Sequence, residues 1–440
     1  MNGEIDFNEQ FARAFDILEN TRRHVFITGQ AGTGKSTLLE YFRNHTSKNV
    51  AVLAPTGVAA INVKGQTIHS FFRFKPDITP ETVQRIRIRK EDRETFENLD
   101  AIIIDEVSMV RADLLDCVDQ FLRKFGPHSR REFGGVQMIL LGDLYQLPPV
   151  VRWMEEEVFR SHYETPYFFS AKVLDTLSLE LIDLFKIYRQ VDDEFIELLN
   201  AIRHNRIKEE HLKKLNNRFI PDFIPDESDF FIYLTTTNAI SDAINIKQLK
   251  RIHGEEFQFQ GRIEGSFDQR SLPTKEMLQL RTGSQVMLLN NDPEGRWVNG
   301  SIGKTLSVTD DLSQTPVVKV ELENGHIVEV GPFTWEMFRF NYNHETQQLE
   351  SESIGSFMQY PLKLAWAVTI HKSQGKTFSK VILDIGSGAF AHGQIYVALS
   401  RCVSLDGIVL RKPIAPRDVI LDPRIVNFMA SIESRPDINR

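Results

Sequence analysis

Residues 29–37 read GQAGTGKST, and their types and spacing suit the binding of a nucleoside triphosphate. The three glycines permit a tight loop whose backbone N–H groups face phosphate at the start of a helix. In such a loop Lys35 reaches the β- and γ-phosphates, and Ser36 is a ligand of Mg²⁺. The sequence therefore predicts ATP and Mg²⁺ as cofactors. The predicted nucleotide contacts in this loop are Gly29, Gly32, Thr33, Gly34, Lys35, Ser36 and Thr37.

Two carboxylates, Asp105 and Glu106, follow the apolar run AIII and would leave a strand end beside this loop. Asp105 can hold Mg²⁺, and Glu106 can orient and deprotonate the attacking water. A glutamate here favours hydrolysis over transfer to an acceptor, which argues against a kinase. The alternative is an Asp-Glu pair that caps the next helix. Gln146, in GDLYQLPPV, could sense the γ-phosphate or the water, and an ordinary surface turn remains the alternative.

Four apolar runs in the first 180 residues must position these groups: VFITG, VAVLAPTG, AIIIDE and VQMILLGD. Short apolar runs that end in glycine or polar residues are typical of buried parallel strands. The segments STLLEYFRN and ADLLDCVDQFLRKF between them have helical spacing, which predicts a doubly wound α/β sheet. Ligands of such sheets bind beyond the carboxyl ends of the strands, so the polar tails of the four runs should converge.

Length and composition limit the class of protein. A chain of 440 residues with 41% hydrophobic and 25% charged residues should form two or more domains with substantial cores. The net charge of −8 argues mildly against a protein that coats nucleic acid nonspecifically, and the basic run QRIRIRKEDR is better explained as a solvated helix face. The acidic N-terminus and the lack of a long apolar run predict a soluble, cytoplasmic protein. Cys117 and Cys402 lack metal-type spacing and are interpreted as reduced structural thiols.

The second half predicts another parallel sheet and a different insertion. The runs FFIYLTTTN, KLAWAVTIHKSQG, KVILDIG and GIVLRKP read as parallel strands. Residues 277–355 instead contain short alternating runs with Asn-Gly and Pro-Glu-Gly turns, which indicates a small antiparallel barrel.

The ordered motifs together resemble superfamily-one helicases, and most closely the Pif-type (petite integration frequency) DNA helicases related to RecD. The matching segments are FNEQ (7–10), GQAGTGKST (29–37), APTGVAA (54–60), GQTIHSFF (65–72), IIIDEVSMV (102–110), FGGVQMILLGDLYQLPPV (133–150), YRQ (188–190), HKSQGKTF (371–378) and YVALSRC (396–402). The resemblance implies two RecA-like domains and an SH3-like β-barrel insertion. The expected division is a first RecA-like domain at 1–178 with a wedge-type insertion at 73–97, a second at 179–276 and 356–440, and the barrel at 277–355.

The resemblance also implies roles for individual residues. Gln10 would read the adenine, Gly375 would contribute to the nucleotide site, and Arg189 and Arg401 would reach the γ-phosphate from the second domain. Arginines of this kind stabilise charge on the transferred phosphoryl group. The catalytic set is then Lys35, Asp105, Glu106, Gln146, Arg189 and Arg401, with Ser36 and Asp105 at the metal.

The predicted nucleic-acid contacts come from strand-end loops of both halves. They are Pro55, Thr56, Gly57, Thr67, His69, Ser70, Phe72, Thr235, Asn238, His371, Lys372, Ser373 and Gln374. Hydroxyls and imidazole suit phosphate, and aromatic rings suit base stacking. Helix capping is the alternative for Thr56, Thr235 and Asn238, and either Phe71 or Phe72 should point into the core.

The implied activity is that of an ATP-dependent 5′-to-3′ DNA helicase that translocates on single-stranded DNA and unwinds duplex or structured DNA. The polarity comes from the resemblance alone. The alternatives are a DNA-stimulated translocase that never separates strands and a nucleotide-switch binding protein with negligible turnover. The expected partners are single-stranded and forked DNA, without a membrane or a stable protein partner.

Overall fold

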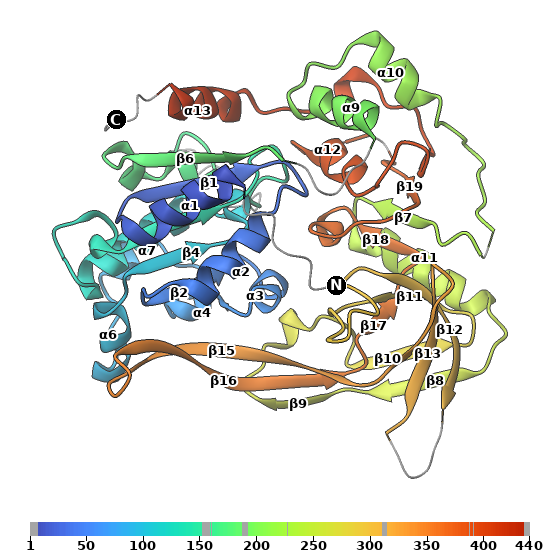
Figure 1. Ribbon diagram of the computed structural model, residues 1–440. Coiled ribbons are helices and arrows are strands. Elements are labelled where there is room, and N and C mark those ends of the chain that lie inside the picture. Colours follow the sequence, from blue (N-terminus) through green and yellow to red (C-terminus); the bar gives the residue numbers. More distant parts are fainter. Residues whose placement is uncertain are drawn as a thin grey trace.

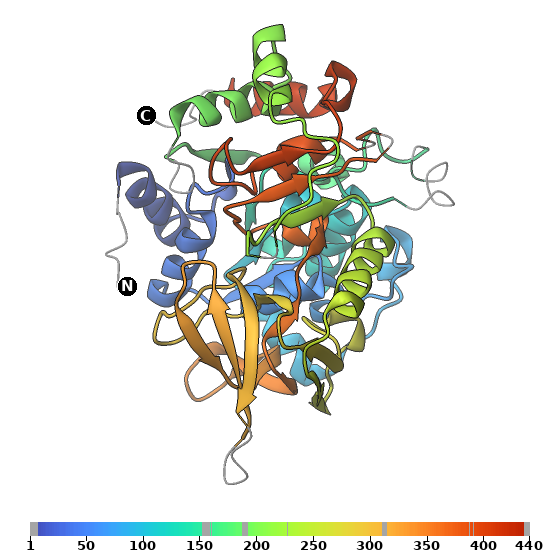
Figure 2. The same ribbon diagram turned by 90° about the vertical axis from the view of Figure 1, so that its right-hand side faces the viewer.

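The computed structural model describes residues 8–151, 159, 161–186, 192–226, 228–309, 315–386, 388–389 and 391–434. Two parallel sheets lie side by side, and a group of antiparallel strands extends below both of them (Figures 1 and 2). Both parallel sheets were predicted from the apolar runs, and both predictions are confirmed.

The first parallel sheet has six strands in the order β3-β2-β4-β5-β1-β6. The strands are β1 (His24–Gly29), β2 (Val50–Ala54), β3 (Gln66–Thr67), β4 (Ala101–Ile104), β5 (Gln137–Leu141) and β6 (Leu179–Leu184). Strand β1 lies between β5 and β6, and β4 lies between β2 and β5. The carboxyl ends of β1, β4 and β5 are therefore adjacent, which places the phosphate loop beside the carboxylates. Because β6 belongs to this sheet, the sheet extends past residue 178.

Helices on both faces cover this sheet. They are α1 (Glu9–Asn20), α2 (Lys35–His45), α3 (Gly57–Asn62), α4 (Ile68–Phe71), α5 (Pro80–Val83), α6 (Lys90–Glu97) and α7 (Ala112–Phe125). Helix α7 is amphipathic, and its apolar residues, including Leu115, Val118 and Leu122, are buried. This burial explains why ADLLDCVDQFLRKF forms a helix, since its apolar residues recur at helical spacing. Both cysteines are buried and carry no disulfide.

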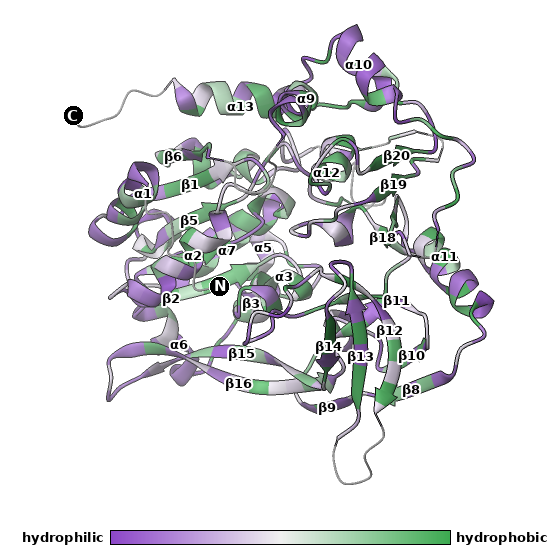
Figure 3. Ribbon diagram, turned by 45° about the vertical axis from the view of Figure 1, so that its right-hand side comes forward, coloured by the Kyte–Doolittle hydropathy of each residue, from purple (hydrophilic) through white to green (hydrophobic). Residues whose placement is uncertain are grey.

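The second parallel sheet has the order β18-β7-β19-β20. Its strands are β7 (Ile232–Thr235), β18 (Ala367–Thr369), β19 (Val381–Leu383) and β20 (Ile408–Leu410). The helices of this part are α9 (Asp193–Arg203), α10 (Glu209–Asn216), α11 (Asn238–Arg251), α12 (Gln394–Leu399) and α13 (Pro423–Glu433). Strands of both parallel sheets are largely hydrophobic, whereas α10 is mostly hydrophilic (Figure 3).

The antiparallel strands extend beyond the predicted range of 277–355 on both sides. A five-stranded sheet has the order β14-β13-β12-β11-β17, a three-stranded sheet β15-β16-β9, and a two-stranded sheet β10-β8. These strands are β8 (Glu256–Gln260), β9 (Arg262–Gly265), β10 (Met277–Arg281), β11 (Gln285–Leu288), β12 (Ile302–Thr309), β13 (Val317–Leu322), β14 (Ile327–Val330), β15 (Phe333–Asn343), β16 (Gln348–Gln359) and β17 (Leu362–Leu364). The pairing of β17 with β11, and of β9 with β16, could not be read from local alternation.

The β15–β16 hairpin reaches the first parallel sheet from below (Figure 1). The Phe340 N–H donates to Gln66 Oε1 at 3.3 Å, the Leu349 N–H donates to Asn49 Oδ1 at 2.7 Å, and His344 Nε2 lies 2.7 Å from Glu94 Oε2. The hairpin therefore joins the insertion to the first half of the chain.

The aromatic residues of GQTIHSFF lie in the core, which corrects one prediction. Phe71 is 6% exposed and Phe72 is fully buried, so both rings point inward rather than one. Phe72 packs against Phe74, Phe96 and Phe121 at centroid distances of 5.3, 6.0 and 5.1 Å. Burial of each such ring contributes about 1.5–3 kcal/mol to the stability of this core. In this arrangement Phe72 is a core residue.

Within the described ranges, none of the helices has both the length and the apolar character needed to cross a membrane.

Candidate active site

The phosphate loop joins β1 to α2 as predicted. Gly32 and Gly34 have φ values of 86° and 87°, and Gly34 is the N-cap of α2, so the loop needs glycine at these turns. Lys35 Nζ donates to the carbonyl oxygens of Gly29 at 2.7 Å and Gln30 at 2.9 Å. Ser36 and Thr37 are exposed at the first turn of α2, and the Thr33 hydroxyl donates to the Gln30 carbonyl. The amine of Lys35 thus lies inside the loop that would surround phosphate.

Asp105 and Glu106 follow β4 and share the electrostatic environment of Lys35. Burial raises the pKa of both carboxyls, and the nearby Asp105 raises that of Glu106 further, to about 7, against the opposing charges of Lys35 and Arg401. Glu106 is not glycine, yet its backbone is left-handed, with φ 53° and ψ 43°. Such strain is uncommon and collects at functional sites. A carboxyl with a pKa near neutrality can accept a proton from water at physiological pH.

Asp143, the residue after Gly142 in GDLYQ, connects several groups of the site. Its Oδ2 accepts from Gln146 Nε2 at 3.3 Å, and its Oδ1 lies 3.0 Å from Arg203 Nη2. Burial would raise the pKa of Asp143, but the charges of Arg203 and Lys35 hold it below its ordinary value. A carboxylate that stays charged in the interior requires such partners.

Gln146 contacts both halves of the chain. In addition to its bond to Asp143, its Oε1 accepts from Gln374 Nε2 at 3.1 Å. Gln374 belongs to the HKSQGKTF segment, which follows β18 in the second parallel sheet. A continuous set of hydrogen bonds therefore joins the nucleotide side of the first sheet to the predicted DNA segment of the second.

Arg203, at the end of α9, was not among the predicted site residues. Its guanidinium forms the buried ion pair with Asp143 and lies 4.3 Å from the ring centroid of Tyr145. The side chain of Arg203 is 6% exposed and that of Asp143 is fully buried. The sequence carries one indirect signal for this pair, since an aspartate directly after a buried parallel strand needs a nearby cation.

Two further contacts join the phosphate loop to the second half of the chain. Gln30 Nε2 donates to Asn200 Oδ1 at 2.5 Å, and the Ala31 N–H donates to the Tyr396 hydroxyl at 3.4 Å. The same hydroxyl lies 3.4 Å from Asp143 Oδ2, and burial raises the pKa of Tyr396 to about 12. Helices α9 and α12 thus contact the phosphate loop and Asp143 together.

Of the two arginines predicted to reach the γ-phosphate, the structure describes Arg401. Arg189 lies outside the described residues. Arg401 is 1% exposed, and it donates to the carbonyl oxygens of Val397 at 3.0 Å and of Ser373 and Lys376 at 3.4 Å. The charge of Arg401 lowers the pKa of Glu106, so Arg401 lies within electrostatic range of this carboxylate. At the same time its guanidinium is hydrogen-bonded to the backbone of residues 373–376.

Gln10 and Gly375, the two remaining residues predicted for the nucleotide site, belong to different halves of the chain. Gln10 Nε2 donates to the carbonyl oxygen of Asp183, whose strand β6 pairs with β1 just before the phosphate loop. Gly375 has a φ of 76°, and a Cβ built on it would meet no atom within 4 Å.

The predicted nucleic-acid residues of the first half form helix N-caps beside the sheet. Thr56 accepts from the Ala59 N–H, and Thr67 accepts from the Ser70 N–H, which supports the capping interpretation of Thr56. Gly57 packs closely against the side chain of Ser271. His69 is half-buried, and this burial lowers the pKa of its imidazole. Pro55 is half-buried and Ser70 is exposed.

In the second half, neither Thr235 nor Asn238 is the cap of α11. Thr237 is the N-cap, and it accepts from the Ile240 N–H, whereas Thr235 is fully buried and Asn238 is exposed at the first helical position. In the HKSQ segment, Lys372 is exposed, the Ser373 hydroxyl donates to Ile370, and burial lowers the pKa of His371.

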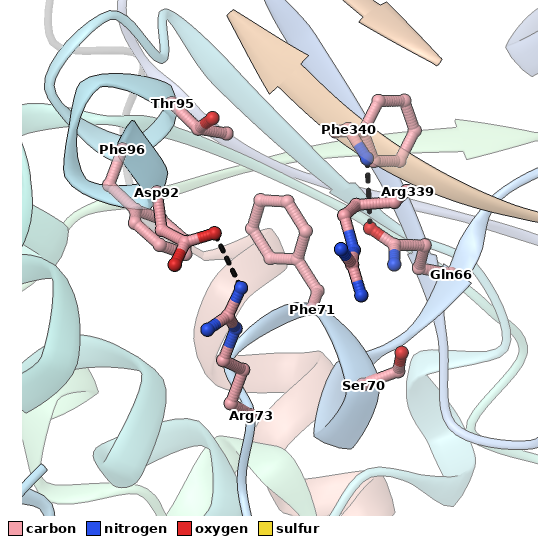
Figure 4. A pocket seen from close by; sticks show the side chains of 9 residues that line it. All are labelled: Gln66, Ser70, Phe71, Arg73, Asp92, Thr95, Phe96, Arg339 and Phe340. Atoms are coloured by element: carbon pink, nitrogen blue, oxygen red, sulfur yellow. Dashed lines mark hydrogen bonds and ion pairs between the residues drawn. The ribbon is translucent and has the colours of Figure 1, made fainter. Parts of the chain in front are cut away.

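A small surface pocket of about 80 Å³ lies between the first sheet's helices and the hairpin (Figure 4). Gln66, Phe71, Arg73 and Arg339 line it, and Arg73 pairs with Asp92 on α6. The pocket lies at the segment of the predicted wedge, away from the phosphate loop.

The residues around the loop fit a nucleotide with Mg²⁺. Ser36 and Asp105 offer oxygen ligands, which Mg²⁺ prefers, and phosphates and waters complete its shell in sites of this kind. Within the described ranges no cluster of three or more metal-binding side chains occurs.

Replacing Arg203 with methionine is expected to destabilise the protein, because Asp143 would lose its direct partner while remaining buried. Removal of one member of a buried ion pair costs about 3–5 kcal/mol. The shift of the urea midpoint measures this effect, and exposed Arg206→Met, in the loop after α9, is the matched control. Equal midpoints for the two variants would contradict the importance of the pair.

The comparisons with known proteins show the family to which this chain belongs. Residues 8–213 match the PIF1-like helicase family. An ATP-dependent DNA helicase Pif1 of Bdellovibrio bacteriovorus is 31% identical over 438 residues, which cover 98% of this chain and 93% of that protein.

Three solved structures of one relative fit this chain to different extents. Bacteroides sp Pif1 in complex with ADP-AlF4 has a TM-score of 0.89 at 34% identity, with 98% of both chains covered. Bacteroides Pif1 bound to ssDNA has the same identity and coverage but a TM-score of 0.68. Unliganded Bacteroides sp Pif1 has a TM-score of 0.88, so the parts of this chain are arranged as in the unliganded and ADP-AlF4-bound structures of that relative. Given these matches along nearly its whole length, the chain belongs to the PIF1-like helicase family.

Proposed function

We propose that this chain, an ATP-dependent DNA helicase of the Pif1 type, moves 5′ to 3′ along single-stranded DNA and separates the strands ahead of it. The observation that carries the proposal is the position of Gln146. Its amide contacts Asp143 beside the phosphate loop and Gln374 in the predicted DNA segment. A change at the nucleotide can thereby alter the grip on DNA.

Within this proposal the site residues divide the work of hydrolysis. Lys35 binds the β- and γ-phosphates, Glu106 takes the proton of the attacking water, and Ser36 and Asp105 would hold Mg²⁺, which supplies charge neutralisation. Gln10 reads the adenine from the far side of β1. The electrostatic effect of Lys35 and Arg401 on Glu106 supports this assignment.

Arg401 acts from the second half of the chain. In the arrangement described, its guanidinium holds the carbonyls of Ser373 and Lys376. We infer that ATP draws Arg401, with Arg189, toward the γ-phosphate, and that residues 373–376 move with it. This coupling makes hydrolysis depend on the relative position of the two RecA-like domains. The lower TM-scores belong to the complexes of the Bacteroides relative with ssDNA, which supports a rearrangement of the two halves when DNA is bound.

The domain division is part of the same proposal. The two parallel sheets correspond to the RecA-like domains, and the five-stranded antiparallel sheet with its neighbours corresponds to an SH3-like insertion. Residues 73–97, which include α5 and α6, would act as the wedge. The contact of Glu94 in this segment with His344 in the β15–β16 hairpin supports a wedge that rests on the insertion.

In this proposal single-stranded DNA crosses both sheets. The strand-end loops with Pro55, Thr56, Gly57, Thr67, His69 and Ser70 contact it on the first sheet. Those with Asn238, His371, Lys372 and Gln374 contact it on the second. Thr235 and Ser373 are buried and would support these loops from below.

A duplex with a single-stranded tail tests the polarity and the strand separation together. With ATP, a 5′-tailed duplex should be unwound, whereas the matched 3′-tailed duplex should remain intact. ATP hydrolysis stimulated by single-stranded DNA without strand release would instead identify a translocase. Hydrolysis that does not respond to DNA would favour a nucleotide switch.

A further inference from the structure

Two lysines of the HKSQGKTF segment lie within electrostatic range of Lys363, where the five-stranded antiparallel sheet meets the second parallel sheet. Lys363 lies on β17, opposite Met287 of β11. Lys372 and Lys376 belong to the HKSQGKTF segment, which follows β18. Two of the three, Lys363 and Lys376, had no role in the sequence analysis. The cluster therefore joins the insertion to the predicted DNA segment.

The loop between β11 and β12 holds Lys376 in place. Lys376 Nζ donates to Asn299 Oδ1 at 2.6 Å, and a Cβ on Gly300 would lie 3.4 Å from Lys376 Cβ. Gly300 has φ 104°, a backbone conformation that favours glycine, so the loop can approach the lysine stem closely. The amine is thus positioned by the insertion.

The charges of the three lysines are not balanced by the protein. Within the described ranges none of them forms an ion pair, whereas Lys380 of the same sheet lies 3.0 Å from Asp229. Burial, together with Lys376 and Lys372, lowers the pKa of Lys363 to about 7, and burial lowers that of Lys376 to about 8. Like charges brought together in a partly buried place are unfavourable unless an anion joins them.

The geometry leaves room for such an anion. A Cβ built on Gly375, between Lys372 and Lys376, would meet no atom within 4 Å. The preceding residue, Gln374, contacts Gln146 of the first half. A polyanion that follows residues 371–374 would therefore continue directly onto the lysines.

We propose that Lys363, Lys372 and Lys376 bind consecutive phosphates of single-stranded DNA, so that the strand passes from the HKSQ segment onto the edge of the insertion. This inference rests on the proposed function, and it adds β17 and the β11–β12 loop to the DNA path. Free phosphate has the same chemistry, but the continuity with Gln374 favours a strand.

Proton uptake follows from this arrangement. Lys363 must be charged to bind phosphate, and the charged groups that face it are Lys376 and Lys372. DNA phosphate stabilises the protonated amine, so binding takes up protons near pH 7. The affinity for DNA should accordingly weaken as the pH rises from 6 to 8.5.

The test measures the dissociation constant of a fluorescent oligo-dT at several salt concentrations. The variants are Lys363→Met, Lys376→Met and the double variant. Lys319→Met, on β13 of the same sheet and paired with Glu329, is the control. Each lysine that contacts a phosphate should contribute about 0.7 to the slope of log affinity against log salt. We expect the slope to fall by about that amount in each single variant and by twice that amount in the double variant, with no change in the control.

The pH series separates phosphate binding from a structural role. Lys363→Arg should restore the salt slope and abolish the loss of affinity between pH 6 and 8.5, since arginine stays charged throughout. Unchanged slopes and unchanged pH dependence in the methionine variants would overturn the inference. Inorganic phosphate that binds to the wild type and not to the double variant, without any change of the DNA slope, would also overturn it. If single-stranded DNA does not stimulate ATP hydrolysis by the wild type, that result would contradict the proposed function and not the assignment of the lysines.

Discussion

Replacing Glu106 with glutamine should lower ATP turnover by about 10²- to 10⁴-fold, the usual contribution of general acid–base catalysis. Glutamine keeps the size of the side chain and its hydrogen bonding, but it cannot accept a proton from water. The backbone strain at φ 53° is unchanged by this substitution, so the fold should be retained. Steady-state hydrolysis with saturating single-stranded DNA measures the loss, and the exposed Glu209→Gln on α10 serves as the control.

The pH dependence of the wild type follows from the same carboxyl. Burial and Asp105 raise the pKa of Glu106 to about 7, so the active, ionised form is lost as the pH falls through this value. The ratio kcat/KM, which reports ionisations of the free enzyme, should decline below about pH 7. The residual activity of Glu106→Gln should lack this decline. A variant that retains both full turnover and the wild-type pH profile would exclude Glu106 as the base.

Replacing Lys35 with alanine should reduce turnover by at least about 10²- to 10³-fold, the range for loss of one preorganised donor to developing charge. The amine lies inside the phosphate loop, bonded to Gly29 and Gln30, and no other described lysine or arginine donates to these carbonyls. Because phosphate binding also depends on this charge, ATP affinity should fall together with kcat.

The variant should nevertheless fold, because Arg203 still neutralises Asp143 after Lys35 is removed. Circular dichroism and the urea midpoint test the fold, and ATP hydrolysis with a fluorescent-nucleotide titration tests the site. The exposed Lys213→Ala on α10 is the control. Turnover equal to that of the control, or a chain that does not fold, would contradict the role given to Lys35.

The sequence allowed the local parts of this site to be predicted. Apolar runs that end in glycine or in polar residues correctly indicated β1, β2, β4 and β5, because buried parallel strands need continuous apolar side chains. GQAGTGKST formed the predicted loop, since glycine spacing determines which turns the backbone can make. These features depend on residues close together in the chain, and they are confirmed by the fold.

Other predictions failed or stayed incomplete because they concern which distant surfaces meet. The residues of GQTIHSFF could not tell that both Phe71 and Phe72 point inward. Nor could the turns within 277–355 show that β9 and β17 join the antiparallel sheets from outside this range. Arg203 was overlooked because its partner Asp143 lies 60 residues away in sequence.

The sequence by itself determined the strands of the parallel sheets, the phosphate loop and the position of Asp105 and Glu106 after a strand end, since these follow from short-range backbone and side-chain preferences. Only the tertiary structure decided that Arg203 and Tyr396 meet Asp143, that Gln374 meets Gln146, and that Lys363 lies beside Lys372 and Lys376. Such contacts depend on how separate sheets pack, and packing is set by the whole core rather than by any one segment.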